Sequence, residues 1–258
     1  MKDLELKLNQ KGARSKLYFL SDFHLGSPDK KESLKREKRL ISLLEEMSTK
    51  AHSIFFLGDV FDFWMEYRHV VPKGYVRFLG KVAELSDQGI NIYFFKGNHD
   101  MWMFGYLKDE CGAHIITDEL SIKIGAKKFL VGHGDGLGPG DTRYKMLKKI
   151  FRNPICIWLF RLVHPDLGIG LANAWSQHSR TKNLEKGEVF LGEKEWLWQY
   201  CKKEHEKQAR DYYIFGHRHL NLDLEVIPAG RYINLGEWIT DSKYVEFDGK
   251  DCQIKTAD

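Results

Sequence analysis

The chain has 258 residues, 43% of them hydrophobic, enough for one large domain with a full core or for a domain with a sizeable insertion. Its 40 basic residues nearly balance 36 acidic ones, and the formal net charge of +4 lacks the large basic excess that would indicate a nucleic-acid partner. The four cysteines are widely spaced, which excludes a CxxC motif or a small disulfide framework and predicts free thiols in a reducing cytosol, and the polar start of the chain indicates no secretion signal.

The first half of the chain alternates apolar runs with segments of helical periodicity. We expect a strand at 16–20, a helix at 33–47, a strand at 53–57, a helix at 74–85 and a strand at 90–95. Strands that alternate with helices imply right-handed crossovers and a largely parallel sheet.

The second half contains two further apolar strand patterns, at 127–131 and 212–215. A stretch rich in Trp, Leu, Lys and Arg separates them and looks helical in several pieces, so we expect a helical cap at approximately 137–207, inserted within a single domain that spans 1–258. The chain closes with four short predicted strands joined by turns, at 222–227, 231–234, 244–247 and 252–255.

Each of the five apolar strands ends in a short polar cluster. The clusters are Asp22-Phe23-His24, Gly58-Asp59-Val60-Phe61-Asp62, Gly97-Asn98-His99-Asp100, Gly132-His133-Gly134-Asp135 and Gly216-His217-Arg218-His219. Strand ends are where an open α/β sheet places its active site, and converging Asp, Asn and His side chains are typical of a site for two divalent metals. Since two ions that share a carboxylate can clamp a phosphate, the pattern indicates phosphate ester chemistry.

One such cluster alone is more often a strand-end turn, with a capping Asp or a hydrogen-bonded His, than a metal site. Five clusters in order, each after an apolar strand, argue against that simpler interpretation for the series. Asp100 and Asp135 are expected to cap loops rather than to bind metal, although Asp135 could also hold a metal-binding His in place. His99 is expected to take part in proton transfer, the alternative being a hydrogen-bonding role alone.

The series of clusters resembles the calcineurin-like metallophosphoesterases over residues 22 to 219. The resemblance implies an α/β fold, a four-layered α/β/β/α sandwich with a helical cap insertion. It also implies two metal sites that share one carboxylate: Asp22, His24, Asp59 and His219 for the first, and Asp59, Asn98, His133 and His217 for the second. His99, oriented by Asp62, would act as the general acid or stabilise the transition state. The expected metal is Mn²⁺, with Fe or Zn as alternatives, because such N/O ligand sets accept several first-row metals.

The insertion resembles the cap of the UDP-2,3-diacylglucosamine diphosphatases, the pyrophosphatases of lipid A synthesis. The resemblance implies a set of substrate-binding residues on the cap and the metal loops: Asp141, Tyr144, Ser179, Asn183 and Lys186, with Asn98, His99 and His217. Taken alone, the polar segment 179–186 would be a solvated helix face. The apolar run 155–160 is too short to span a bilayer. We expect it to line an acyl-chain chamber or to rest on a membrane surface, the alternative being ordinary helix packing within the cap.

Two positions depart from this family. Its well-characterised members carry Arg where this chain has His99, and Glu where it has Asp62. Replacing Arg by His loses a permanently charged, bidentate phosphate donor. Either His99 and a cap residue such as Arg143 or Arg180 compensate for this loss, or the substrate differs.

The resemblance implies hydrolysis of UDP-2,3-diacylglucosamine to UMP and 2,3-diacylglucosamine 1-phosphate. The enzyme would be cytoplasmic and in peripheral contact with the inner membrane surface, with no nucleic-acid partner, and the sequence carries no signal for an oligomeric state. One alternative is a phosphoesterase that acts on another nucleotide or sugar phosphate. The other is a non-catalytic scaffold that binds a protein partner, but such proteins typically lose metal ligands and all seven candidates are present here.

Overall fold

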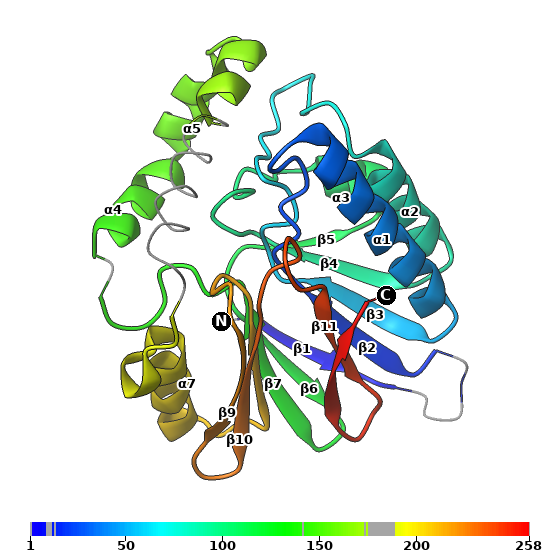
Figure 1. The fold of residues 1–258 in the computed structure, drawn as a ribbon, viewed down its shortest axis with the longest axis vertical. Helices are drawn as coiled ribbons and strands as arrows, with labels where there is room; N and C mark the ends of the chain where they lie inside the picture. Colours follow the sequence, from blue (N-terminus) through cyan, green and yellow to red (C-terminus); the bar gives the residue numbers. More distant parts are fainter. Residues whose placement is uncertain are drawn as a thin grey trace.

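The computed structural model describes residues 2–8, 12, 14–140, 142–172, 174 and 189–257. Within these residues the strands form two six-stranded sheets (Figure 1). The first sheet has the order β1 (Lys2–Leu6), β6 (Leu120–Ile124), β7 (Lys127–Gly132), β8 (Tyr212–Phe215), β10 (Gly230–Leu235) and β9 (Asn221–Val226). The second has the order β12 (Cys252–Thr256), β11 (Lys243–Phe247), β2 (Lys16–Leu20), β3 (Ala51–Phe56), β4 (Asn91–Phe95) and β5 (His114–Ile116).

Neighbouring strands at the centre of each sheet are parallel. In the second sheet β2, β3, β4 and β5 run in one direction, and in the first sheet β7, β8 and β10 do the same. The carboxyl ends of β2, β3 and β4 therefore meet at one edge of their sheet, and those of β7 and β8 meet at one edge of the other. This arrangement gathers the loops that carry the polar clusters.

One hydrophobic core lies between the two sheets. In β2 the alternate residues Leu17 and Phe19 point into this core, where Phe19 stacks on Phe55 of β3 with ring centroids 4.9 Å apart. Phe129 of β7 faces Phe19 from the opposite sheet at 6.0 Å. The remaining residues of β2, Tyr18 and Leu20, face the outer side, so this strand is buried on both faces and reads as a continuous apolar run.

Helices cover the outer faces of both sheets and complete four layers. The second sheet is covered by α1 (Lys30–Ser48), α2 (Val76–Asp87) and α3 (Tyr106–Cys111), and α1 begins where Asp29 accepts the amides of Lys31 and Glu32. The first sheet is covered by α7 (Trp196–Lys207), whose Leu197 and Cys201 are buried against it. Helix α7 lies within the range 137–207 predicted for the cap, yet its packing makes it the fourth layer of the sandwich.

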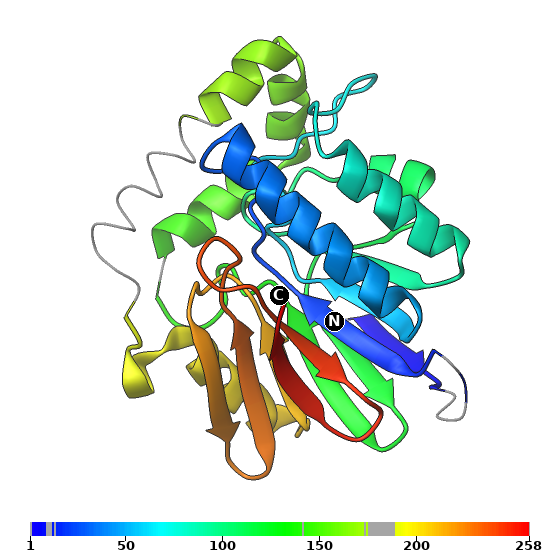
Figure 2. The ribbon, with the colours of Figure 1, turned by 45° about the vertical axis from the view of Figure 1, so that its right-hand side comes forward.

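Two helices of the predicted cap stand away from the sheets. They are α4 (Thr142–Phe151) and α5 (Pro154–Arg161), neither of which has a buried residue, and α5 lies at the upper end of the molecule in both views (Figures 1 and 2). In the described part of the chain, no single helix is long and apolar enough to cross a membrane. The helices Pro154–Arg161 and Pro165–Ala172 reach that length and composition only as a pair, and they are bent by 119° where they meet.

Candidate metal centre

The loops that follow β2, β3, β4, β7 and β8 meet at one end of the sandwich. Their backbones are hydrogen-bonded to one another: the Asp22 amide donates to the Gly58 carbonyl at 3.1 Å, and the Gly216 amide donates to the His133 carbonyl at 3.0 Å. All seven side chains predicted to bind metal lie on these loops. The second sheet supplies Asp22, His24, Asp59 and Asn98, and the first supplies His133, His217 and His219.

One group of ligand atoms comes from Asp22, His24 and His219, which lie within 4.8 Å of one another. The Nε2 atoms of His24 and His219 are 3.3 Å apart, and Asp22 Oδ1 lies 3.8 Å from the first and 3.6 Å from the second. Asp22 Oδ1 is buried and has no hydrogen-bond partner among the described residues, an arrangement that is costly unless the oxygen binds a cation. These atoms therefore fit a divalent metal site.

A second group comes from Asn98, His133 and His217. Asn98 Oδ1 lies 3.1 Å from His133 Nε2 and 2.9 Å from His217 Nδ1. His133 Nδ1 donates to the Leu57 carbonyl at 2.8 Å, which leaves Nε2 available as a ligand atom. Burial lowers the pKa of His217 to about 4, with a further contribution from His133, and the neutral imidazole is the form that binds metals.

The carboxylate of Asp59 lies between these two groups. Its Oδ2 atom is 4.0 Å from His24 Nε2 in the first group and 3.4 Å from His133 Nε2 in the second. Burial raises the pKa of Asp59, but the neighbouring histidines His133, His99 and His24 together outweigh burial and hold the pKa well below its usual range. The arrangement suits a carboxylate shared by two cations.

Four of the candidate ligands have an unusual backbone conformation. Asp22, His24, Asp59 and His217 have φ angles of 54°, 45°, 50° and 66°, in the left-handed region that side chains other than glycine seldom adopt. Each such residue costs about 1–3 kcal/mol and persists only where the surroundings enforce it, as at functional sites. The sharp turns bring these side chains toward a common point directly after their strands.

Asp100 ties two of the loops together, as expected for a capping residue. Its carboxylate accepts the amides of Gly97 and Val60, both at 2.8 Å, and more distantly those of Asp59 and Phe61. Burial raises the pKa of Asp100 to about 7, and the negative charge of Asp59 adds to the rise. Asp100 therefore fixes the backbone of the shared carboxylate without facing the ligand groups itself.

His99 and Asp62 lie side by side at the rim of the centre. His99 Nδ1 is 3.0 Å from the backbone carbonyl of Asp62, and Asp62 Oδ1 is 3.6 Å from that nitrogen and 3.7 Å from His24 Nδ1. The His99 amide donates to Asp59 Oδ1 at 2.8 Å. His99 is therefore held by both the Asp62 loop and the shared carboxylate.

On the cap side the structure describes Tyr144, whereas Asp141, Ser179, Asn183 and Lys186 lie outside the described residues. The Tyr144 hydroxyl donates to Asp135 Oδ2 at 2.5 Å, and its ring centroid is 6.3 Å from that of His217. Lys148 Nζ pairs with the same Asp135 oxygen at 2.7 Å. The Asp135 carboxylate thus anchors α4 beside the metal loops through two side chains of that helix.

Two further buried arginines support the ligand loops. Arg36 of α1 donates to the backbone carbonyls of His24 and Ser27. Arg218, which stands between His217 and His219, donates from Nε to Glu195 Oε1 at 2.9 Å, and Glu195 is fully buried. The position of Arg218 inside a ligand cluster was a usable sequence signal, but nothing in the sequence near Glu195 or Arg36 marks either residue.

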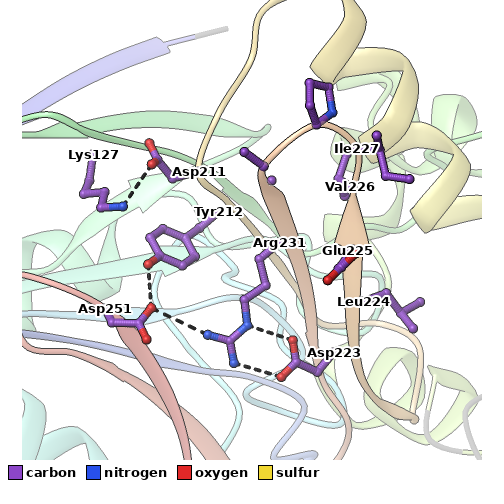
Figure 3. A pocket seen from close by; sticks show the side chains of 13 residues that line it. Lys127, Asp211, Tyr212, Asp223, Leu224, Glu225, Val226, Ile227, Arg231 and Asp251 are labelled. Carbon is purple, nitrogen blue, oxygen red and sulfur yellow. Dashed lines mark hydrogen bonds and ion pairs between the residues drawn. The ribbon is translucent and has the colours of Figure 1, made fainter.

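One cavity of the described structure lies away from these residues (Figure 3). It has a volume of about 700 Å³ and adjoins the β9–β10 hairpin and the amino ends of β7 and β8, whereas the metal loops follow their carboxyl ends. Its polar groups pair with one another: Lys127 with Asp211, Tyr212 with Asp251, and Arg231 with Asp223. This mutual pairing leaves little to recognise a ligand, so the chemistry belongs at the metal loops.

The family model for calcineurin-like phosphoesterases matches residues 15–221, a segment that contains all seven candidate ligands. The chain is 41% identical over 249 residues to the UDP-2,3-diacylglucosamine hydrolase of Porphyromonas gingivalis, covering 92% of this chain and 95% of that protein. It is 26% identical over 236 residues to the UDP-2,3-diacylglucosamine hydrolase of Edwardsiella ictaluri, covering 90% and 88%. Among solved structures, an archaeal phosphodiesterase aligns with 93% of this chain and 99% of its own at 16% identity and a TM-score of 0.47.

Proposed function

Because the chain belongs to the calcineurin-like phosphoesterase family, whose model matches residues 15–221, we propose that it is a hydrolase that cleaves the diphosphate of UDP-2,3-diacylglucosamine in lipid A synthesis. The observation that carries the substrate is the 41% identity to a UDP-2,3-diacylglucosamine hydrolase across 92% of this chain. The products are UMP and 2,3-diacylglucosamine 1-phosphate. The reaction is consistent with the shared carboxylate, Asp59, between two groups of ligand atoms.

Two divalent cations fit the centre, and we assign Asp22, His24, Asp59 and His219 to the first and Asp59, Asn98, His133 and His217 to the second. When bound, such a pair clamps a phosphate and activates a water for in-line attack. Mn²⁺ is our choice, with Fe or Zn as alternatives, since the oxygen and imidazole ligands suit several first-row metals. The protein contributes the fixed positions of these ligands, which its strained loops and Asp100 maintain.

His99 is proposed to deliver a proton to the leaving group or to stabilise the charge that develops on the phosphate. Its Nδ1 faces the Asp62 carbonyl, which can only accept, so Nδ1 carries a proton, and we assign the contact with the substrate to Nε2. The Asp62 carboxylate lies 3.6 Å from Nδ1 and helps to hold the ring in this orientation.

The rest of the substrate is proposed to lie between the metal loops and the cap. The residues assigned to it are Asn98, His99, His217 and Tyr144, together with Asp141, Ser179, Asn183 and Lys186. Tyr144 is the described member on the cap, and its hydroxyl and ring lie beside the second group of ligand atoms.

We propose that the enzyme is cytoplasmic and works in peripheral contact with the inner membrane. Its acyl-chain substrate resides in a lipid phase, and α5 exposes large apolar side chains on the cap. Ile155, Trp158 and Leu159 are 68%, 59% and 52% exposed. Apolar side chains gathered in this way are typical of surfaces that contact a membrane or a partner.

The function is tested by incubating the purified chain with Mn²⁺ and detergent-solubilised UDP-2,3-diacylglucosamine and measuring UMP. We expect metal-dependent release of UMP and of 2,3-diacylglucosamine 1-phosphate. If the chain hydrolyses bis-p-nitrophenyl phosphate with Mn²⁺ but releases no UMP, its substrate is another nucleotide or sugar phosphate. Hydrolysis of neither compound would support the non-catalytic scaffold.

A further inference from the structure

The loops after β3 and β4, which carry Asp62 and His99, run side by side. Beyond the His99 contact with the Asp62 carbonyl, the Trp64 amide donates to the His99 carbonyl at 3.4 Å. Farther along, Met65 and Trp102 form an isolated parallel bridge. The two loops therefore behave as one short ribbon with His99 at one end and Trp102 at the other.

Trp102 connects this ribbon to two helices of the cap, α4 and α5. Its indole Nε1 donates to the carbonyl of Phe151, the last residue of α4, at 2.9 Å. Its ring stacks on Phe160 of α5, with centroids 5.2 Å apart and planes 25° apart, and meets the ring of Phe63 edge-on at 5.9 Å. A single side chain thus contacts α4, α5 and the residue next to Asp62.

A second contact braces the same junction from α5. Arg161 donates from Nε and Nη2 to the backbone carbonyl of Glu66, at 3.1 and 3.0 Å, and its guanidinium lies 4.3 Å from the centroid of the Phe104 ring. The buried Glu66 carboxylate accepts the amides of Phe104 and Gly105. These contacts fix the Trp102 end of the ribbon, whereas neither α4 nor α5 contains a buried residue, and α4 is otherwise held through Tyr144 and Lys148 at Asp135.

We propose that Trp102 is a positioning residue that ties α4 and α5 to the ribbon carrying His99, and so sets the distance between the cap and the metal centre. The inference rests on the proposed function, because it concerns a substrate that reaches both the metal loops and the cap. Such a substrate needs both binding regions at a fixed separation for its phosphate to be aligned for attack. A small diester that contacts only the metal loops has no such requirement.

The test compares the wild-type chain with Trp102→Ala and Trp102→Phe on two substrates, UDP-2,3-diacylglucosamine in detergent and bis-p-nitrophenyl phosphate, both with Mn²⁺. For Trp102→Ala we expect kcat/KM to fall about 10- to 100-fold on the lipid nucleotide and to stay within about two-fold on the small diester. Trp102→Phe retains an aromatic ring that can stack on Phe160 but lacks the N–H donor and part of the ring area, so it should recover most of the loss. An equal loss on both substrates, or no loss on either, would overturn the proposal.

Trp198→Ala is the matched control, because this indole also donates to a backbone carbonyl at 2.9 Å, that of Glu225, but joins α7 to β9. It should leave the ratio of the two activities unchanged. Amide hydrogen exchange tests the Trp102 contacts with α4 and α5 without any substrate. Trp102→Ala should raise the exchange rates of amides in α4 and α5 and leave those in β3 and β4 unchanged. If the wild-type chain releases no UMP, the proposed function fails, and unchanged exchange in α4 and α5 would separately refute the tie.

Discussion

Asp59 is the residue on which both proposed cation sites depend, because its carboxylate lies between His24 and His133. Asp59→Asn keeps an acceptor for the His99 amide and tolerates the left-handed backbone, but it removes the shared charge. We expect metal content to fall from two ions per chain to at most one, and turnover to drop on the order of 10³-fold, as for the loss of several kcal/mol of transition-state stabilisation. Elemental analysis of the purified variant and UMP release check both.

The control for this substitution is Asp223→Asn, which removes a carboxylate that is paired with Arg231 in the distant cavity. It should keep two metal ions and wild-type turnover. Two bound ions together with near-wild-type turnover in Asp59→Asn would contradict the bridging role.

The close approach of the two loops requires glycine at position 97, because a Cβ there would overlap the side chain and the amide of Asp59. Gly97→Ala must push the shared carboxylate or the loop out of place, at a cost of about 1–3 kcal/mol as for other overpacked sites. Gly80 in α2 is the matched control, since a Cβ there meets nothing within 4 Å, and Gly80→Ala should stabilise the chain by about 0.5–1 kcal/mol. Urea denaturation measures the free energy of unfolding of both variants and of the wild type. If Gly97→Ala is as stable as the wild type, the loop accommodates the added methyl group without cost.

At the scale of elements, Glu246 of β11 joins three neighbouring strands. Its Oε1 accepts from Lys16 of β2 at 2.7 Å and from Lys255 of β12 at 2.8 Å. Burial raises the pKa of Glu246, but hydrogen bonds from these two lysines outweigh it and the pKa is lowered. A carboxylate whose pKa is lowered by folding adds stability above its unfolded pKa, near 4.3, and loses that contribution as the pH falls through the folded value.

We therefore expect Glu246→Gln to lower the free energy of unfolding by roughly 1 kcal/mol at pH 7, with the difference shrinking as the pH falls below about 4. Urea titrations of both proteins across this range measure it. Glu5→Gln serves as the control, because the Glu5–Lys123 pair is exposed, and it should change little at any pH. A difference for Glu246→Gln that is constant with pH would exclude the ion pairs as its cause.

At the scale of the molecule, the exposed apolar face of α5 predicts how the enzyme meets its substrate. Trp158 and Leu159 are 59% and 52% exposed, and replacing both by Ser removes apolar area without touching the metal loops. We expect the double variant to bind vesicles of phosphatidylethanolamine and phosphatidylglycerol about ten-fold more weakly, as judged by co-sedimentation. Its turnover of bis-p-nitrophenyl phosphate should be unchanged, and undiminished vesicle binding would assign the face to another role.

The sequence predicted the central strands well, because β2, β3, β4 and β8 are buried on both faces and appear as unbroken apolar runs. It did not indicate β1, which is mostly exposed, or β6, where buried residues alternate with more exposed ones, and charges interrupt both runs. The range predicted for the cap included α7, which packs on the first sheet. A Trp-rich amphipathic helix shows the same sequence pattern whether it covers a sheet or projects from it.

The candidate ligands were foreseen because each directly follows a strand, and the structure brings all seven together, although their binding of metal stays a prediction. The residues that hold the loops were harder to find. Arg218 and Glu195 are 23 residues apart and meet only through the fold. Trp102 belongs to no motif, so its contacts with α4 and α5 could not be inferred from spacing.

The distribution of the candidate ligands over the two sheets has a thermodynamic consequence. Each proposed cation takes ligands from both sheets, the first through His219 opposite Asp22 and the second through His133 opposite Asn98. An unfolded chain, with these residues spread from position 22 to 219, cannot assemble either set, so the ions bind only the native state. Each ten-fold rise of free metal above the dissociation constant therefore adds about 1.4 kcal/mol to the free energy of unfolding. The two ions would therefore link the two sheets of the sandwich. Removing them with a chelator would lower the free energy of unfolding as well as stop the reaction.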